Sequence, residues 1–131
     1  MIVDTSALLA VVFNEPDGRR FAEAIAGAPA ARMPAATWFE ATLAVDTAGD
    51  ELAARRFDEV VRILQIELIA FTPEHALQAR EARRIYGKQR HPAQLNFGDC
   101  IVYGVAKTER EALLFKGNDF SQTDLEPALK D

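Results

Sequence analysis

Short apolar segments alternate with longer amphipathic segments along almost the whole chain of 131 residues. Strands are expected at residues 2–3, 31–33, 66–71 and 112–115, with a last short edge strand at 125–129. The spacing of apolar residues predicts helices over residues 6–13, 19–26, 35–44, 50–64, 74–86 and 98–107. Strands that alternate with helices form parallel sheets with right-handed crossover connections. The sequence therefore predicts an α/β fold, with a central parallel β-sheet flanked by helices.

The length suits a single domain over residues 1–131, and the proportions of hydrophobic residues (49%) and charged residues (27%) argue against disorder. No apolar run approaches the ~18 residues of a membrane span, and the first residues lack the basic region of a signal peptide. The only cysteine, Cys100, excludes an internal disulfide. We therefore expect a cytoplasmic protein without a membrane partner.

Four acidic residues stand apart from the charged faces of the predicted helices. Asp4 ends the first strand, Asp99 lies in the first turn of a helix, and Asp119 follows the strand at 112–115. Strand ends and helix N-termini meet at one edge of a parallel sheet, so these three carboxylates can converge there. Glu40 interrupts an otherwise apolar helix face, where a carboxylate needs a partner, and it joins them if its helix crosses that edge.

Each acid also has a simpler interpretation. Asp4 can cap the following helix, Asp99 can interact with a helix dipole, Asp119 can form a turn, and Glu40 can mark an amphipathic boundary. A cluster of carboxylates needs cations to remain ionised, because like charges raise one another's pKa. The two histidines show no metal-ligand spacing, so hard oxygen ligands favour Mg²⁺ or Mn²⁺. Sites of this kind catalyse phosphoryl chemistry.

The acids occur within four short motifs, in the order Ile2-Val3-Asp4-Thr5-Ser6-Ala7-Leu8, Phe39-Glu40, Phe97-Gly98-Asp99-Cys100 and Asn118-Asp119-Phe120. This pattern resembles the PIN-domain ribonucleases. The nearest likeness is to the VapC toxins of bacterial VapBC toxin–antitoxin pairs, and it covers essentially the whole chain. The turn Lys116-Gly117-Asn118 is a variant of the family's pattern.

The resemblance implies a single PIN domain with a three-layer fold, acting as a Mg²⁺- or Mn²⁺-dependent endoribonuclease toxin on tRNA, rRNA or mRNA. It implies that Asp4 and Asp99 are the principal metal ligands and that Glu40 and Asp119 complete the catalytic pocket. It also implies that Thr5 and Ser6 support Asp4, that the protein forms a homodimer, and that a VapB-type antitoxin neutralises it. Asp124 matches an auxiliary acid only loosely, and an ordinary surface role is the preferred interpretation.

A basic segment offers a means of binding RNA despite the chain's net charge of −5. Residues 80–91 contain one acid and five basic residues, namely Arg80, Arg83, Arg84, Lys88 and Arg90. Such a segment can hold phosphates, and Tyr86 can stack on a base. A solvated helix face and loop is the alternative interpretation.

Two other functions remain open from the sequence. A Mg²⁺-dependent phosphatase of the haloacid-dehalogenase type also begins with an Asp at the end of its first strand. That chemistry requires a second Asp two residues later, where this chain has Ser6. A catalytically silent PIN-like module that binds RNA or a partner is the other alternative, although all four acids are present.

Overall fold

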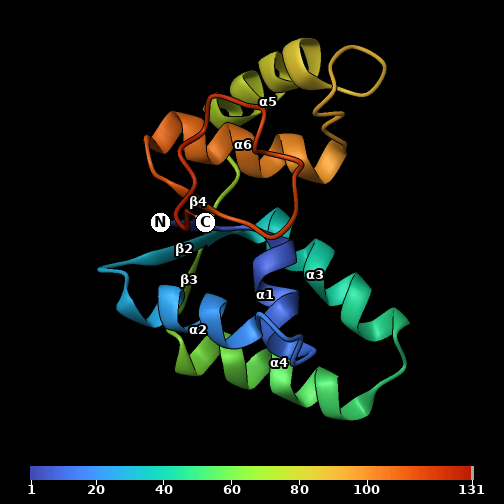
Figure 1. Ribbon diagram of the computed structural model, residues 1–131, viewed down its shortest axis with the longest axis vertical. Coiled ribbons are helices and arrows are strands. Elements are labelled where there is room, and N and C mark those ends of the chain that lie inside the picture. The colour runs from blue at the N-terminus through green and yellow to red at the C-terminus, as the bar shows by residue number, and fades with distance from the viewer. Residues whose placement is uncertain (131) are drawn as a thin grey trace.

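Four short parallel strands form the centre of the computed structural model, which describes residues 1–130 (Figure 1). They are β1 (Ile2–Val3), β2 (Ala31–Pro34), β3 (Ile66–Ile69) and β4 (Leu113–Leu114), in the spatial order β3-β2-β1-β4. In register, Ile2 lies opposite Arg32 on one side and Leu113 on the other. β1 is fully buried, as expected for an inner parallel strand covered on both faces, and the edge strand β4 is also buried because the segment around Pro127 lies along its outer side.

Helices cover both faces of the sheet, which gives three layers (Figure 1). The structure contains α1 (Thr5–Val12), α2 (Gly18–Gly27), α3 (Ala35–Thr47), α4 (Glu51–Ile63), α5 (Pro73–Tyr86) and α6 (Phe97–Glu109). Side chains from α1 to α4 form one apolar core, and side chains from α5 and α6 form the other. The α/β fold predicted from the sequence is therefore confirmed, and no helix among residues 1–130 is both long and apolar enough to cross a membrane.

The segment predicted as a final strand, residues 125–129, is not a strand. It makes a single bridge beside β4, in which Leu113 N donates to Glu126 O and Ala128 N donates to Leu113 O, both within 2.9 Å. Alternate residues of a strand pair with opposite neighbours, and the Leu114 carbonyl accepts from Asp4 N on the β1 side. Only Leu113 of this two-residue strand therefore faces the segment, and the pairing does not extend into a ladder.

Local hydrogen bonds fix where the helices near the sheet begin. Asp4 caps α1, and reciprocal capping boxes begin α5 at Thr72 and α6 at Asn96. Gly104 lets α6 approach α5 closely, because a Cβ there would lie 2.4 Å from the His75 carbonyl oxygen. These contacts place the N-terminal ends of α1 and α6 at fixed positions relative to β1.

Candidate active site

Asp4 is held at the end of β1 by the residue two positions later. Its Oδ2 accepts hydrogen bonds from Ser6 N (3.0 Å) and Ser6 Oγ (2.6 Å), and the residue is only 6% exposed. Ser6 Oγ accepts from Lys116 N at 2.9 Å, which leaves its own proton to donate to Asp4. Asp4 is thus the helix cap that the simpler interpretation predicts. Its orientation is fixed by the backbone and hydroxyl of Ser6, and Lys116 in turn fixes that hydroxyl.

Asp99 also caps a helix while it lies in the same acidic region. Asn96 N donates to Asp99 Oδ2 at 3.0 Å, and Asp99 N donates to Asn96 Oδ1 at 2.9 Å. The residue is 9% exposed in the first turn of α6. The capping box fixes the start of α6 and, with it, the position of this carboxylate.

Glu40 reaches the region from α3, and its side chain is exposed although its neighbours on the helix face are apolar. The neighbouring Phe39 is 58% exposed, which shows that this stretch of α3 borders an open groove and not the core. Thr5 supplies the partner expected for this carboxylate, because its Oγ1 donates to Glu40 Oε1 at 2.9 Å. The backbone of Thr5 also favours the ionised form of Asp4 and lowers its pKa, in line with the support for Asp4 that the resemblance implies.

Gly98 provides the space that the Glu40 carboxylate occupies. A Cβ at residue 98 would lie 2.1 Å from Glu40 Oε2. Because the end of a glutamate side chain moves easily, Gly98→Ala is expected to displace Glu40 with little loss of stability. We expect the RNA cleavage that the resemblance implies to fall about tenfold in this variant, as in Glu40→Gln, because groups that support a metal site are worth about that much. Thermal unfolding should stay within a few degrees of wild type. A Gly98→Ala protein with full activity would contradict this role for residue 98.

Asp119 and Asp124 lie on the segment after β4 but have different surroundings. Asp119 is in an exposed turn and faces the site closely enough for its charge to affect Asp99. Asp124 instead accepts hydrogen bonds from Tyr103 Oη at 2.6 Å and from Lys107 Nζ at 2.5 Å. Asp124 therefore fastens its segment to α6, in agreement with the preferred interpretation of an ordinary acid there.

The acids share one electrostatic environment. Burial raises the pKa of Asp4 to about 6 against the effect of its bonds to Ser6, and the charge of Glu40 adds to the rise. Burial also raises the pKa of Asp99 to about 7, with further contributions from the charges of Asp119, Asp4 and Glu40. Asp99 thus feels the charges of the other three predicted acids, and Asp4 feels that of Glu40.

The donor chemistry at this edge fits a hard divalent cation. All the converging groups are carboxylates, and the two buried ones are difficult to ionise without a nearby positive charge. Within residues 1–130, no three acidic, histidine or cysteine side chains are already gathered as an ion site. Mutual repulsion between carboxylates favours such separation, so an ion would have to draw them together.

Two connected apolar grooves border the acidic site. One, of about 490 Å³, passes along Phe39, Glu40 and Gly98, and the other, of about 700 Å³, passes along Asn96 and Cys100. They share three lining residues, namely Phe71, Phe97 and Ile101. The sequence analysis missed Phe39 and Phe97 as exposed groove residues, although each directly adjoins an acidic motif.

The structure sorts the predicted basic residues into two groups. Arg80, Arg83 and Lys88 line the larger groove. Arg84 instead forms an ion pair with Glu81 at 2.9 Å, and Arg90 does not line it. Tyr86 packs its ring against His91 and Tyr103, so it is engaged within the fold.

The family model described as "PIN domain" matches residues 1–126. The chain belongs to the PIN-domain family. The family predicted from the sequence is therefore confirmed, and membership excludes the haloacid-dehalogenase phosphatase. In this PIN domain, Ser6 stands where that chemistry needs a second Asp, and it donates a hydrogen bond to Asp4.

Several relatives of this PIN domain match over nearly their whole length. It is 41% identical over 125 residues to "VapC ribonuclease Mb0640" of Mycobacterium bovis, covering 95% of each chain. It is 40% identical over 130 residues to "Ribonuclease VapC28" of Mycobacterium tuberculosis, covering 98% of each. The likeness to VapC proteins expected from the sequence is thus confirmed.

Solved structures agree in fold. The M. tuberculosis VapC20 toxin, described as cleaving the sarcin-ricin loop, superposes with a TM-score of 0.71 at 18% identity and 95% coverage of both chains. VapBC2 from Rickettsia felis, solved with a DNA fragment from its promoter, gives a TM-score of 0.76 at 16% identity, covering 96% of this chain and 94% of that one. At these identities the likeness concerns the fold, and it agrees with the three-layer PIN architecture.

Proposed function

We propose that the protein is an endoribonuclease that acts as the toxin of a toxin–antitoxin pair. The observation that carries this proposal is that two buried carboxylates, Asp4 and Asp99, lie in a PIN fold near enough to Glu40 to feel its charge, with Asp119 acting on Asp99 as well. The relatives that are about 40% identical over nearly the full chain are named as VapC ribonucleases, which supports the same activity.

Asp4 and Asp99 would hold a Mg²⁺ or Mn²⁺ ion. Such an ion supplies charge neutralisation at the phosphate and activation of water. Ser6 keeps the Asp4 carboxylate in one orientation, and Thr5 does the same for Glu40. Water attacks the scissile phosphate in line and the bond to the 3′ oxygen breaks, leaving a 5′-phosphate and a 3′-hydroxyl. This hydrolysis needs no catalytic histidine, which fits a chain that has only two histidines without metal-ligand spacing.

Arg80, Arg83 and Lys88 are suited to hold RNA phosphates beside the acids, because they share a groove that also reaches Asn96 and Phe97. Arg83→Ala is expected to weaken RNA binding and to reduce the salt dependence of binding by about one phosphate contact. The matched control is Arg84→Ala on the same helix, whose side chain pairs with Glu81. Fluorescence anisotropy at several salt concentrations measures both. Equal losses in the two variants would contradict the assignment.

Exposed apolar side chains beside the acids suit the predicted homodimer. Phe97 is 84% exposed, Phe39 58% and Leu43 53%, and all three line the smaller groove. A second copy of the chain is the proposed cover for this face. Phe97→Asp is then expected to convert a dimer to a monomer in light scattering after gel filtration. An unchanged dimer mass would place the interface elsewhere.

A VapB-type antitoxin is the proposed neutralising partner. The solved structures similar in fold include a toxin–antitoxin complex from Klebsiella pneumoniae and the R. felis VapBC2 assembly. A basic or aromatic antitoxin segment inserted beside the acids would supply the positive charge or apolar surface that the site and its grooves accommodate.

Incubation of the purified protein with total cellular RNA tests the proposed function. Discrete fragments with 5′-phosphate ends are expected with Mg²⁺ or Mn²⁺ and not with EDTA. A folded wild type that binds RNA without cutting it under any of these conditions would favour the silent binding module.

A further inference from the structure

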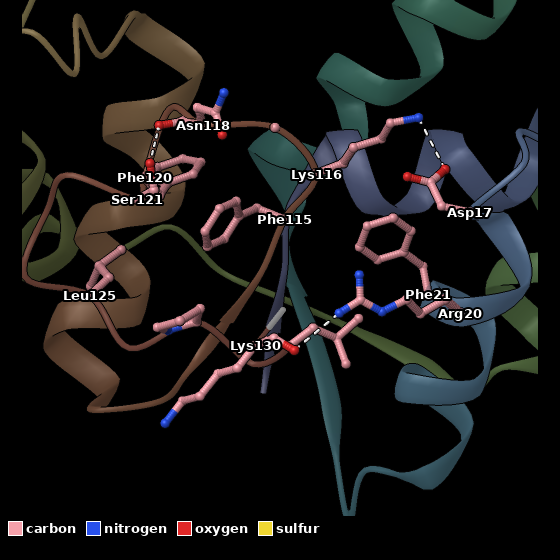
Figure 2. A pocket seen from close by; sticks show the side chains of 13 residues that line it. Asp17, Arg20, Phe21, Phe115, Lys116, Asn118, Phe120, Ser121, Leu125 and Lys130 are labelled. Atoms are coloured by element: carbon pink, nitrogen blue, oxygen red, sulfur yellow. Dashed lines mark hydrogen bonds and ion pairs between the residues drawn. The ribbon is translucent and has the colours of Figure 1, made fainter.

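A separate cavity of about 450 Å³ lies between α2 and the segment after β4 (Figure 2). Three phenylalanines contribute to its lining, of which Phe21 and Phe120 are buried and Phe115 is half-buried. Figure 2 shows Phe115 and Phe21 on either side of the space, and Phe120 packs against Phe115 with ring centroids 5.3 Å apart. The volume is within the range of pockets that hold small organic ligands, so it can hold one nucleobase.

The rim of this cavity is polar and mainly basic. Arg20, Lys116 and Lys130 line it together with a single acid, Asp17. Lys116 Nζ is paired with Glu15 Oε1 at 2.6 Å and with Asp17 Oδ1 at 3.0 Å, which ties the segment after β4 to the start of α2. The exposed Asn118 also lines the cavity and presents an amide with both donor and acceptor groups.

The cavity adjoins the acidic site through its own wall. The backbone N–H of Lys116 donates to Ser6 Oγ at 2.9 Å, and Ser6 Oγ donates to Asp4 at 2.6 Å. Asn118 in the wall immediately precedes Asp119. The wall of the cavity is therefore one hydrogen bond away from the residue that holds Asp4, and one residue away from Asp119.

We propose that this cavity is a base-binding subsite, which takes one unstacked nucleobase of the RNA strand next to the cleaved phosphate. Aromatic side chains are the usual platform for a splayed-out base in single-stranded RNA. Asn118 offers hydrogen bonds to the edge of the base, and Lys130 at the rim can attract the adjoining phosphate. Polar groups beside phenylalanine rings match a nucleobase, which has flat faces and polar edges, better than an apolar protein segment. The inference rests on the proposed function.

Binding to a cleavage-blocked protein tests the subsite separately from catalysis. In an Asp4→Asn background, anisotropy measures the Kd for short single-stranded RNAs of A, U, C or G. Adding Phe115→Ala is expected to weaken binding of at least one of them about tenfold, the usual effect of losing one stacked base. The salt dependence should stay the same, because no phosphate contact is lost. Phe115→Trp is the matched control and should keep tight binding.

A second variant tests the subsite independently, in case Phe115→Ala disturbs folding. Ser121 is exposed and lines the cavity, so Ser121→Trp should fill the space and weaken RNA binding to a similar degree. Thermal unfolding verifies that each variant is folded. If the folded variants bound RNA as tightly as the parent protein, the proposed subsite would be wrong. The same conclusion would hold if the variants lost binding of a protein partner but kept binding of RNA. RNA cleavage by the wild-type protein is measured in a separate assay. A failure of the proposed nuclease function can therefore be told apart from a failure of the proposed base-binding subsite.

Discussion

Asp99→Asn is expected to lower the rate of RNA cleavage by at least about a hundredfold, and Asp4→Asn to do the same. Asparagine keeps the size of the side chain and an oxygen acceptor, but it removes the charge that would hold a divalent cation. Weakening groups that only support metal ligands already costs about 10–100-fold, so loss of a ligand should cost more. The rate of cleavage of a defined RNA with excess enzyme measures the effect.

Asp124→Asn is the matched control for these substitutions. Asp124 lies five residues after Asp119 on the same segment, but its carboxylate is bonded to Tyr103 and Lys107 of α6. We expect its cleavage rate to stay within about threefold of wild type. If Asp124→Asn abolished cleavage and Asp99→Asn did not, the assignment of the site acids would be wrong.

The metal-free protein is expected to become less stable as the pH rises from about 4 to about 8. Burial raises the folded-state pKa of Asp4 to about 6 and that of Asp99 to about 7. In the unfolded chain these groups return to their ordinary pKa values, near 3.8. Between the two values the folded state holds protons that the unfolded state has released. The free energy of unfolding therefore falls with pH in this window, by at most about 7 kcal/mol, because the two pKa values rise by about two and about three and each pKa unit is worth about 1.4 kcal/mol.

Urea denaturation in EDTA at pH 5 and pH 8 measures this loss. Adding Mg²⁺ to the wild-type protein at pH 8 should raise its free energy of unfolding again, because the ion binds the folded state. Asp99→Asn should flatten the pH dependence and abolish most of the Mg²⁺ effect. Asp124→Asn should leave both unchanged, since Lys107 and Tyr103 outweigh burial and lower the pKa of Asp124. A metal-free wild type equally stable at both pH values would contradict the electrostatic account.

The positions of Asp4 and Asp99 could be predicted because each follows from backbone topology. A residue after a parallel strand and a residue in the first turn of a helix lie at the same sheet edge in any fold of this class. Both also cap helices, so the simpler interpretation and the functional one describe the same atoms. For these two residues, the local sequence therefore predicts both the start of a helix and the position of the carboxylate at the sheet edge.

The environment of Glu40 could not be predicted in the same way. Apolar neighbours suggested burial, but Phe39 faces an open groove whose other wall comes from α6, far away in the sequence. The basic segment posed a similar problem, because the pairing of Arg84 with Glu81 depends on side-chain conformation as well as helical spacing. The cavity behind Asn118 forms only when α2 packs against a distant segment, so no local pattern indicates it.

The hydrogen bond from Lys116 to Ser6 has a consequence for how such chains can diverge. Its donor is a backbone N–H, so residue 116 can carry almost any side chain without disturbing Asp4. Proline is the exception, because it has no N–H to donate. Residue 6 cannot vary in this way, because its hydroxyl must accept a hydrogen bond from Lys116 N and donate one to Asp4. Among active relatives, we therefore expect wide variation at position 116 and small hydroxyl residues at position 6.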